Sequence, residues 1–446
     1  MIDKLKYKIM NISILYSMVS TLTVILFFSC DFIYESPVNH IQNSDKICTD
    51  SPDGFISLDN DNADESGKIL WEVIIGGEST ECANAIQQTT DDGFIIAGYT
   101  KTTIFKTSDF YIIKLNPKGD LVWTNTFGNK YSDFAYSVQQ TSDGGYIVAG
   151  EKRKYRLLDD FNLSLTYRHD ILIIKVDANG NMEWEKTFGG ADYDRANLII
   201  QTSDSGYIIA GHTQSYGAEY DPGPHAKKDL WIIKLDSSGE VEWEQLYGGS
   251  DSSEGANSIQ QTSDDGYIIC GFTSKQGSGN YDFLVLKLDY SGNIEWEKSY
   301  GGAYPENANS IIQTSEGGYI VVGETMSFGF GYYDYWILKL DSEGNIIWDN
   351  AYGGEKFERA KSVCQTSDNG YIIAGYTSSF GKGNKDCWIL RLNSDGSERW
   401  TRTYGNEGME VANSIQQTTD GNYIVAAQTS SKGAGENDIW ILKLSE

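Results

Sequence analysis

One phrase of eleven residues returns seven times along the chain, and this repetition constrains the fold more than any other feature. Its clearest copy is QTSDGGYIVAG at residues 140–150, and the copies begin at Gln88, Gln140, Gln201, Gln261, Gln313, Gln365 and Gln417. Asp143 resembles a catalytic acid, but an acid at a repeated position is primarily structural. We predict that it starts a type I turn, with Gly145 in the left-handed conformation. Asn422 takes the same place in the last copy, and Asn tolerates that conformation next best.

The repeated unit has the composition of short strands. Its tryptophans are Trp71, Trp123, Trp184, Trp243, Trp296, Trp348 and Trp400, and a spacing of roughly 50 residues is typical of blade-like all-β repeats. Each unit has four runs rich in β-branched and aromatic residues, as at 346–353, 360–366, 370–377 and 386–393. The chain's 13% aromatic residues and 47 glycines against 6 prolines suit many strands and tight turns.

The two ends of the repeat array are complementary. The chain enters the array on a first-type strand and leaves it on a fourth-type strand, so residues 68–74 can pair with residues 438–444. That pairing removes both free edges. We therefore predict an all-β fold, a closed seven-bladed β-propeller with four antiparallel strands per blade, in which the N-terminal strand completes the last blade. An open solenoid is the alternative, but it needs polar capping repeats, and the terminal units look like the others.

The hairpins at 173–184, 231–243 and 336–348 resemble the tryptophan-docking repeat of quinoprotein-like propellers, a family that includes envelope assembly lipoproteins. Glycine pairs such as the one at 353–354 resemble those of kelch repeats. The resemblance covers residues 64–446, although the usual Thr before the hairpin glycine is missing. It implies that the first strand of each unit is outermost and the second lines the axis. Both tight hairpins would then lie on one face and the other connections on the opposite face.

The first residues differ from the rest. Residues 1–29 resemble a bacterial lipoprotein signal peptide, with Cys30 as the lipidated residue. An uncleaved membrane anchor is the alternative, and either one places the protein outside the cytoplasm, anchored to the membrane at the cell envelope or surface. Residues 30–66 are acidic and unpatterned, as in a flexible tether, and the propeller domain spans 67–446. The remaining cysteines do not follow the repeat, so we expect small buried residues rather than a disulfide framework.

Every unit carries a carboxylate at the start of its second strand. These residues are Glu81, Asp133, Asp194, Glu254, Glu306, Glu358 and Glu410. In a closed ring they would circle one mouth of the axial channel, where a divalent cation or a basic peptide could bind. The alternative is that each caps its own turn or pairs with the basic residue of a fourth strand. Those basic residues are Lys114, Lys175, Lys234, Lys287, Lys339, Arg391 and Lys443.

The repeat is interrupted in units two and three, where the connection before the fourth strand lengthens to 151–169 and 212–228. Long loops on a rigid scaffold often bind ligands, although tolerated insertion explains them equally well. The binding candidates here are Arg153, Tyr155, Arg156, His169, His212, Tyr220 and His225. The histidines lack the close spacing of a zinc site, so the sequence leaves a metal undecided.

The charge and the motifs narrow the function. A net charge of −28 argues against nucleic acid as a partner, and no nucleophile elbow, phosphate loop, HExxH or CxxC occurs in the chain. We expect no catalytic residue and no cofactor beyond that cation. The sequence predicts a noncatalytic binding or scaffold protein, a monomer that recognises a protein or glycan through one propeller face. The alternatives are a glycosidase or lyase with carboxylates converging across that face and, third, a quinoprotein-type dehydrogenase.

Overall fold

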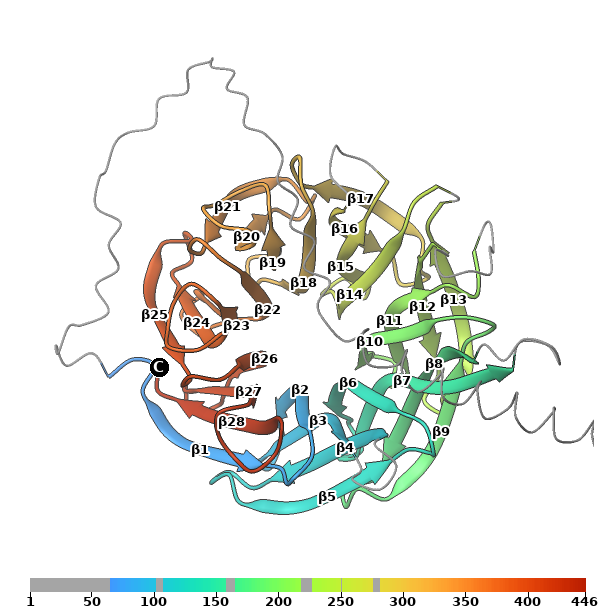
Figure 1. Cartoon of the computed structure of the whole chain (residues 1–446). Helices are drawn as coiled ribbons and strands as arrows, with labels where there is room; N and C mark the ends of the chain where they lie inside the picture. Colours follow the sequence, from blue (N-terminus) through green and yellow to red (C-terminus); the bar gives the residue numbers. More distant parts are fainter. Residues whose placement is uncertain (1–64, 102–106, 158–164, 218–226, 250, 276–280) are drawn as a thin grey trace, which may run out of the picture. The chain divides into compact units, whose positions relative to one another are not determined.

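The computed structural model describes residues 65–101, 107–157, 165–217, 227–249, 251–275 and 281–446. All regular structure in these ranges is β-strand, arranged as seven four-stranded antiparallel sheets in a ring (Figure 1). The protein is therefore an all-β, closed seven-bladed β-propeller, as the repeat predicts. The predicted signal peptide, Cys30 and nearly all of the tether lie outside the described residues and stay predictions.

Blades are numbered from the one that begins with β2, and the strands of a blade are counted outward from the axis. The second strand of a sequence unit is therefore the inner strand of a blade. The third and fourth strands of the unit are the second and third strands of the blade, and the first strand of the next unit is its outer strand. The inner strands are β2 (Glu81–Gln88), β6 (Asp133–Gln140), β10 (Asp194–Gln201), β14 (Glu254–Gln261), β18 (Glu306–Gln313), β22 (Glu358–Gln365) and β26 (Glu410–Gln417). The second strands are β3 (Phe94–Lys101), β7 (Tyr146–Leu157), β11 (Tyr207–Thr213), β15 (Tyr267–Thr273), β19 (Tyr319–Thr325), β23 (Tyr371–Thr377) and β27 (Tyr423–Thr429). The third strands are β4 (Ser108–Leu115), β8 (Leu165–Val176), β12 (Asp229–Leu235), β16 (Asp282–Leu288), β20 (Asp334–Leu340), β24 (Asp386–Leu392) and β28 (Asp438–Leu444). The outer strands are β5 (Leu121–Phe127), β9 (Met182–Phe188), β13 (Val241–Tyr247), β17 (Ile294–Tyr300), β21 (Ile346–Tyr352), β25 (Glu398–Tyr404) and, for blade 7, β1 (Ile69–Ile75).

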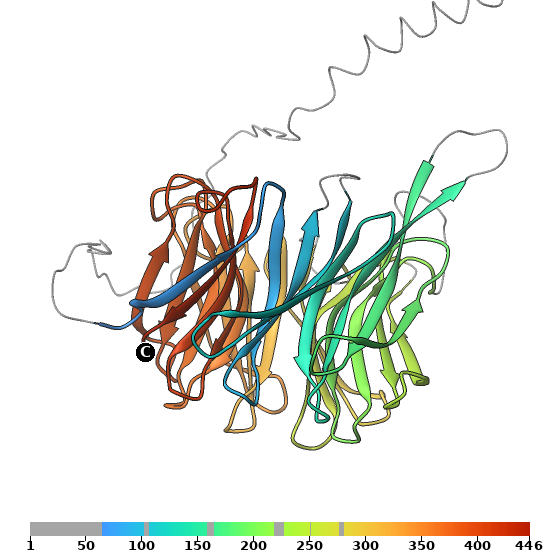
Figure 2. The same ribbon diagram turned by 90° about the horizontal axis from the view of Figure 1, so that it is seen from below.

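The predicted closing strand is in place. β1 pairs antiparallel with β28, with Trp71 opposite Lys443 and Val73 opposite Ile441, so blade 7 takes its strands from both ends of the array. The lower face carries the tight hairpins from inner to second strand and from third to outer strand. The upper face carries the other connections, including the long β7–β8 hairpin that rises above the ring in Figure 2.

Each blade is buried on both sides by its neighbours. In blade 3, Ile208 and Ile232 pack with residues of blade 4 such as Ile269, while Ile209 and Ile233 pack with residues of blade 2. Successive strand residues point to opposite faces of a sheet, so strands such as β12 are apolar at nearly every position rather than at every second one. These interfaces together form a ring of seven hydrophobic clusters.

A tryptophan on each outer strand locks one blade to the next. Trp243 lies edge-on to Tyr267 of the following blade, with ring centroids 6.1 Å apart. It also lies directly beneath Gly292 in the third-to-outer hairpin of that blade, where a Cβ atom would stand 2.9 Å from the indole. Gly292 has a φ of +83°, so glycine is required both for its backbone conformation and for its lack of a side chain.

The repeated phrase forms the lower-face turn, but not through the glycine that the sequence suggests. The left-handed residue is Gly144, with a φ of +85°, and not Gly145 or its counterpart Asn422. Asp92, Ser205, Asp265 and Asn369 take that conformation in other copies. Gly145 is needed for space instead, because a Cβ there would lie 2.4 Å from the Val176 carbonyl oxygen.

The turn acid also binds the basic residue of the third strand. Asp143 accepts hydrogen bonds from the Thr141 hydroxyl (2.5 Å) and the Gly145 N–H (2.9 Å), and it lies 2.9 Å from the ammonium of buried Lys175. Burial alone would raise the pKa of Asp143, but these contacts lower it to about 2. Of the two alternatives for the inner-strand carboxylates, pairing with the basic residues does not occur, because the basic groups lie at the lower end of the blades and the carboxylates at the upper end.

The docking contact can be tested with two glycines of similar backbone conformation. Gly144→Ala places a Cβ in open space, so it should cost only about 1 kcal/mol of unfolding free energy for the left-handed backbone. Gly292→Ala adds the clash with Trp243 and should cost roughly 2–4 kcal/mol in total. Denaturant unfolding measures both values. Equal losses would show that the tryptophan contact does not restrict the hairpin.

Candidate functional site

The seven inner-strand carboxylates begin their strands at the upper end of the blades, where they are buried. Glu358 is typical: its Oε2 accepts the Gly354 N–H (2.8 Å) and its Oε1 the Thr377 hydroxyl (2.8 Å). Turn N–H groups donate in the same way to Glu81, Asp133, Asp194, Glu306 and Glu410. These hydrogen bonds match the interpretation that each carboxylate caps its own turn. The binding of a cation or a basic peptide by this ring stays a prediction.

Each capping carboxylate lies close to an aspartate on the third strand of the preceding blade. A Cβ at Gly353 would lie 1.8 Å from Oδ1 of Asp334 and 2.8 Å from Oε2 of Glu358, so the two carboxyls meet over this glycine. Within the described residues, Oδ1 of Asp334 is buried without a hydrogen-bond partner, as are the same atoms of Asp109, Asp170, Asp282 and Asp438. Burial, and then the negative charge of Glu306, raises the pKa of Asp282 to about 6. A shared proton therefore fits the pairs in which burial raises the pKa of the aspartate, as it also does at Asp229 and Asp334.

These pairs should make the propeller more stable in mild acid. A carboxyl whose pKa is raised on folding adds stability that is present below its unfolded pKa and lost as the pH rises through about 6. The melting temperature should thus fall between pH 5 and pH 7.5. Asp282→Asn removes one charge of a pair and should raise the melting temperature at pH 7.5.

The matched control is Asp289→Asn in the same blade, because hydrogen bonds from Asn293 and its backbone lower the pKa of this hairpin aspartate. It should not stabilise the protein at pH 7.5. A wild-type protein that is more stable at pH 7.5 than at pH 5, and is unchanged by Asp282→Asn, would contradict the shared proton.

The sevenfold regularity ends beside these carboxylates. The next residue of each inner strand and its partner on the second strand differ in every blade. The pairs are Cys82 with Tyr99, Phe134 with Glu151, Arg195 with His212, Gly255 with Phe272, Asn307 with Glu324, Arg359 with Tyr376, and Val411 with Gln428. We call this set the variable ring. One step further along the inner strand an alanine is buried in every blade, so the variation is confined to this level of the upper face.

Two blades also break a ring of asparagines just below. In five blades a bulged asparagine donates to the alanine carbonyl of the next inner strand, as Asn309 does to Ala360 at 2.7 Å. Tyr136 and Lys361 replace it in blades 2 and 6. The guanidinium of Arg195 lies over the Tyr136 ring, 3.8 Å from its centroid. Burial and the charges of Arg359 and Arg195 lower the pKa of Lys361, against the effect of Glu324.

The predicted histidines belong to a packed cluster on blades 2 and 3. The ring of Tyr193 lies between His169 and His212, with centroid distances of 4.5 and 5.4 Å. Glu151 accepts the Tyr193 hydroxyl at 2.8 Å, and its Oε1 lies 3.2 Å from Nδ1 of His169. Burial, with the charges of Lys228 and Arg195, holds the pKa of His212 well below its usual range. The two histidines are thus brought together, and both are buried.

The predicted loop of blade 2 is in fact a strand extension. β7 and β8 continue pairing out to Leu157 and Leu165, with Arg153 opposite His169. The Arg153 guanidinium lies 5.8 Å from the Phe134 ring centroid. Tyr155 and Arg156 belong to β7, but their side chains are not described, and Tyr220 and His225 lie outside the described residues. Within those residues, no group of three or more His, Cys, Asp or Glu side chains is arranged to hold a metal ion.

A group of exposed aromatic side chains covers the upper face over blades 4 to 6. The exposed fraction is 87% for Phe330, 61% for Tyr332 and 58% for Tyr304, and about 40% for Tyr281 and Phe357. We call these five residues the aromatic patch. Tyr332 stacks on Phe357 at 5.2 Å and 11°. Sequence reasoning missed this patch, although its signal is present: unit five reads SFGFGYYDY at 327–335 where unit six reads SFGKGNKDC at 379–387.

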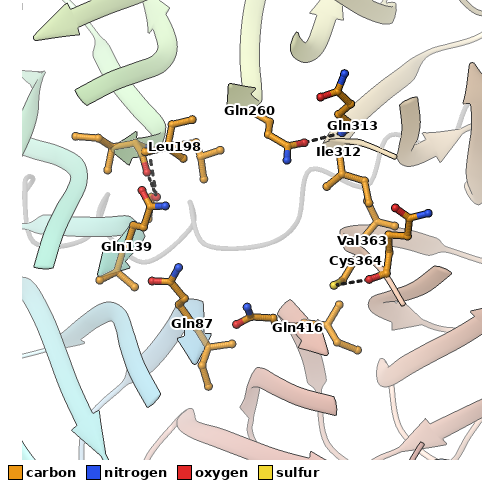
Figure 3. A pocket seen from close by; sticks show the side chains of 16 residues that line it. Gln87, Gln139, Leu198, Gln260, Ile312, Gln313, Val363, Cys364 and Gln416 are labelled. Carbon is orange, nitrogen blue, oxygen red and sulfur yellow. Dashed lines mark hydrogen bonds between the residues drawn. The ribbon is translucent and has the colours of Figure 1, made fainter. Parts of the chain in front are cut away.

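The axial channel is neutral where the inner strands line it. A cavity of about 400 Å³ is surrounded by glutamine, aliphatic and small polar side chains, among them Gln87, Gln139, Gln260 and Gln416 (Figure 3). The side-chain Oε1 of Gln260 accepts the main-chain N–H of Gln313 in the next blade at 2.6 Å. No charged side chain of the described residues lines this cavity. The charged groups of the inner strands therefore lie above this cavity, in the capping carboxylates, in the variable ring and at Lys361 just below it.

A second cavity of about 300 Å³ lies on the upper face beside the aromatic patch. It is lined by Lys228 of blade 3, by Phe272 and Tyr281 of blade 4, and by Glu324 and Tyr333 of blade 5, together with Pro305, Glu306 and Asn307. It therefore joins the variable ring to the aromatic patch, and it combines aromatic, cationic and hydrogen-bonding groups in one place.

Comparisons with known proteins give distant structural matches and no specific function. A scan against models of protein families gives no match, and a search of curated protein sequences gives none. Among solved structures, 196 chains match. The propeller domain of the trilobed protease from Pyrococcus furiosus is 11% identical, with 82% of this chain and 94% of that chain covered and a TM-score of 0.43. The WD40 domain of Neurospora crassa Pan2 is 12% identical, with 81% and 89% covered and a TM-score of 0.45.

An enzyme is also among the matches: the acylaminoacyl peptidase of Pyrococcus horikoshii is 11% identical, with 78% of this chain and 51% of that chain covered and a TM-score of 0.41. Among the described residues, no helix is long and apolar enough to cross a membrane. The ring of seven four-stranded antiparallel sheets itself makes the protein a seven-bladed β-propeller.

Proposed function

We propose that this propeller is a noncatalytic binding protein of the bacterial cell envelope, and that it recognises a glycan or a protein through its upper face. The observation that carries the proposal is the difference between the two faces. The lower face presents seven similar polar turns, whereas the upper face bears the variable ring and the aromatic patch. Exposed aromatic groups above a rigid scaffold mark interaction sites more often than scattered single residues do.

The exposed aliphatic side chains support the assignment of the upper face. Within the described residues, the exposed leucine, isoleucine, valine and methionine side chains lie at the outer strands, as Leu121 and Ile294 do. The upper face concentrates tyrosine and phenylalanine instead. Such rings provide a large contact area at a low cost in conformational entropy.

The carboxylates of the variable ring favour binding over hydrolysis. Glu151 and Glu324 are the two acids of this set, and both are held by neighbours. Burial acts to raise the pKa of Glu151, but His169, Arg195 and Tyr193 lower it. Glu324 accepts the Asn309 amide at 2.5 Å. Glycoside cleavage commonly needs one acid with a raised pKa, so the lowered pKa of Glu151 supports a hydrogen-bond acceptor there rather than a proton donor.

Envelope anchorage rests on the sequence of residues 1–29 and on Cys30. We propose that a lipid on Cys30 attaches the chain to the membrane and that the propeller meets its ligand outside the cytoplasm. Incorporation of a labelled fatty acid into the wild-type chain, and its loss in Cys30→Ala, would support this anchorage.

Two surface variants test the proposed face. Phe330→Ala combined with Tyr332→Ala should abolish retention of envelope glycans or proteins by the immobilised full chain. Tyr290→Ala, which removes a 71% exposed aromatic of the lower face, should leave retention unchanged. Both sites are exposed, so both proteins should keep the wild-type melting temperature. Retention that survives the double variant but fails in Tyr290→Ala would assign binding to the lower face.

A further inference from the structure

We infer that the cavity between blades 3, 4 and 5 binds a saccharide that carries a single carboxylate, of the hexuronic acid class. This inference rests on the proposed function, because the cavity belongs to the upper face. It names the ligand chemistry that the aromatic, cationic and hydrogen-bonding groups of the cavity would recognise together.

The walls of the cavity are suited to a sugar ring. Phe272 and Tyr281 meet edge to face with centroids 5.2 Å apart, and Tyr333 lies on the blade 5 side. A volume of about 300 Å³ is at the lower end of the range for small-ligand sites and suits one or two sugar residues. The C–H faces of a pyranose are apolar and pack on aromatic rings, while its hydroxyl groups remain directed to the sides.

Lys228 supplies an unusual cation at one wall. Its ammonium lies 5.7 Å from the ring centroid of Tyr193 and 5.9 Å from that of Phe272. None of the described carboxylates forms an ion pair with it, whereas the framework lysine Lys234 has Asp204 at 2.8 Å. Burial, followed by the charge of Arg195, lowers the pKa of Lys228. A partly buried and unpaired ammonium gains most from an anionic ligand group.

The blade 5 wall carries hydrogen-bond acceptors, and the negative charge of Glu324 is balanced by the nearby guanidinium of Arg359. Glu324 lies 3.9 Å from Nε of Arg359 and accepts from Asn309 at 2.5 Å, and the Arg359 guanidinium lies over the Tyr333 ring at 4.8 Å. A carboxylate here accepts hydrogen bonds from hydroxyl groups and repels a second anion. A ligand that places one carboxylate near Lys228 and hydroxyl groups near Glu324 is a sugar acid rather than a polyacidic peptide.

The neighbouring framework carboxylate does not neutralise Lys228. Glu306 also borders the cavity, but its Oε1 accepts the Thr325 hydroxyl (3.0 Å) and the Ser327 N–H (3.2 Å), and its Oε2 accepts the Gly302 N–H (3.0 Å). Its lone pairs are thus directed to its own turn. The ammonium of Lys228 remains the group available for the ligand carboxylate.

The test is calorimetric titration of the full chain in detergent with galacturonate, which carries one carboxylate, and with its neutral counterpart, galactose. Galacturonate should bind about tenfold more tightly or better, the range expected for a hydrogen bond to a charged group. Lys228→Gln should remove this preference, while Lys227→Gln, the adjacent exposed lysine, should keep it. Tyr281→Ala should weaken both sugars, with the lower-face variant Tyr290→Ala as its control.

Each other result overturns the inference. Equal affinity for the charged and the neutral sugar removes the role of Lys228. Binding of tetraglutamate that depends on Lys228, with no binding of galacturonate, replaces the sugar acid by an acidic peptide. If neither sugar binds while the Phe330 and Tyr332 variant still loses envelope retention, the ligand class is wrong but the proposed face stands. If that retention is also unaffected, both proposals fail. Melting temperatures confirm that each variant is folded.

Discussion

The ring depends on one antiparallel pairing, that of β1 with β28. Without it, blade 7 would be a three-stranded sheet with a free edge, and free edges promote aggregation. The same strand also holds blade 7 against blade 1, because Trp71 lies edge-on to Phe94 and beneath Gly119 of that blade. The strand β1 therefore completes the sheet of blade 7 and the interface between blades 7 and 1. Both contacts are needed to close the ring of seven blades.

The interfaces between blades repeat three contacts around this ring. A tryptophan lies beneath a hairpin glycine, two carboxyls meet over a glycine, and in five blades an asparagine reaches the next inner strand. These contacts fix the angle between blades without using the variable ring or the aromatic patch. Those positions are consequently free to differ, and the groups proposed to bind ligand are found there.

The repeat predicted the number of blades, the strand order and the closing strand because each depends only on period and strand type. The prediction for the left-handed residue of the lower turn was wrong by one residue. The aligned copies indicate the correct position, that of Gly144, because other units carry Asp, Ser or Asn there, and Asp and Asn tolerate this conformation. The repeat also left open a pairing of the basic residues with the inner-strand carboxylates, since position along a blade follows from strand register and not from proximity in the sequence.

The candidate site was less accessible to sequence reasoning. Long connections drew attention to blades 2 and 3, whereas the aromatic patch changes composition without changing loop length. The variable ring lies next to an invariant alanine, and only the register of inner and second strands joins Asn307 to Glu324 or Arg195 to His212. The convergence of Lys228 and Glu324 on one cavity spans two blade interfaces, which no local pattern encodes.

The position of β1 also has a consequence for biogenesis. It is made before every other strand of the ring, yet its partner β28 ends at Leu444, so blade 7 cannot assemble until that residue has been synthesised. Contacts between such distant segments form slowly. A chain interrupted before this point would leave β1 unpaired and its apolar residues available to proteases. A chain can therefore close the ring only after β28 has been made, and chains that end earlier would be open to proteolysis.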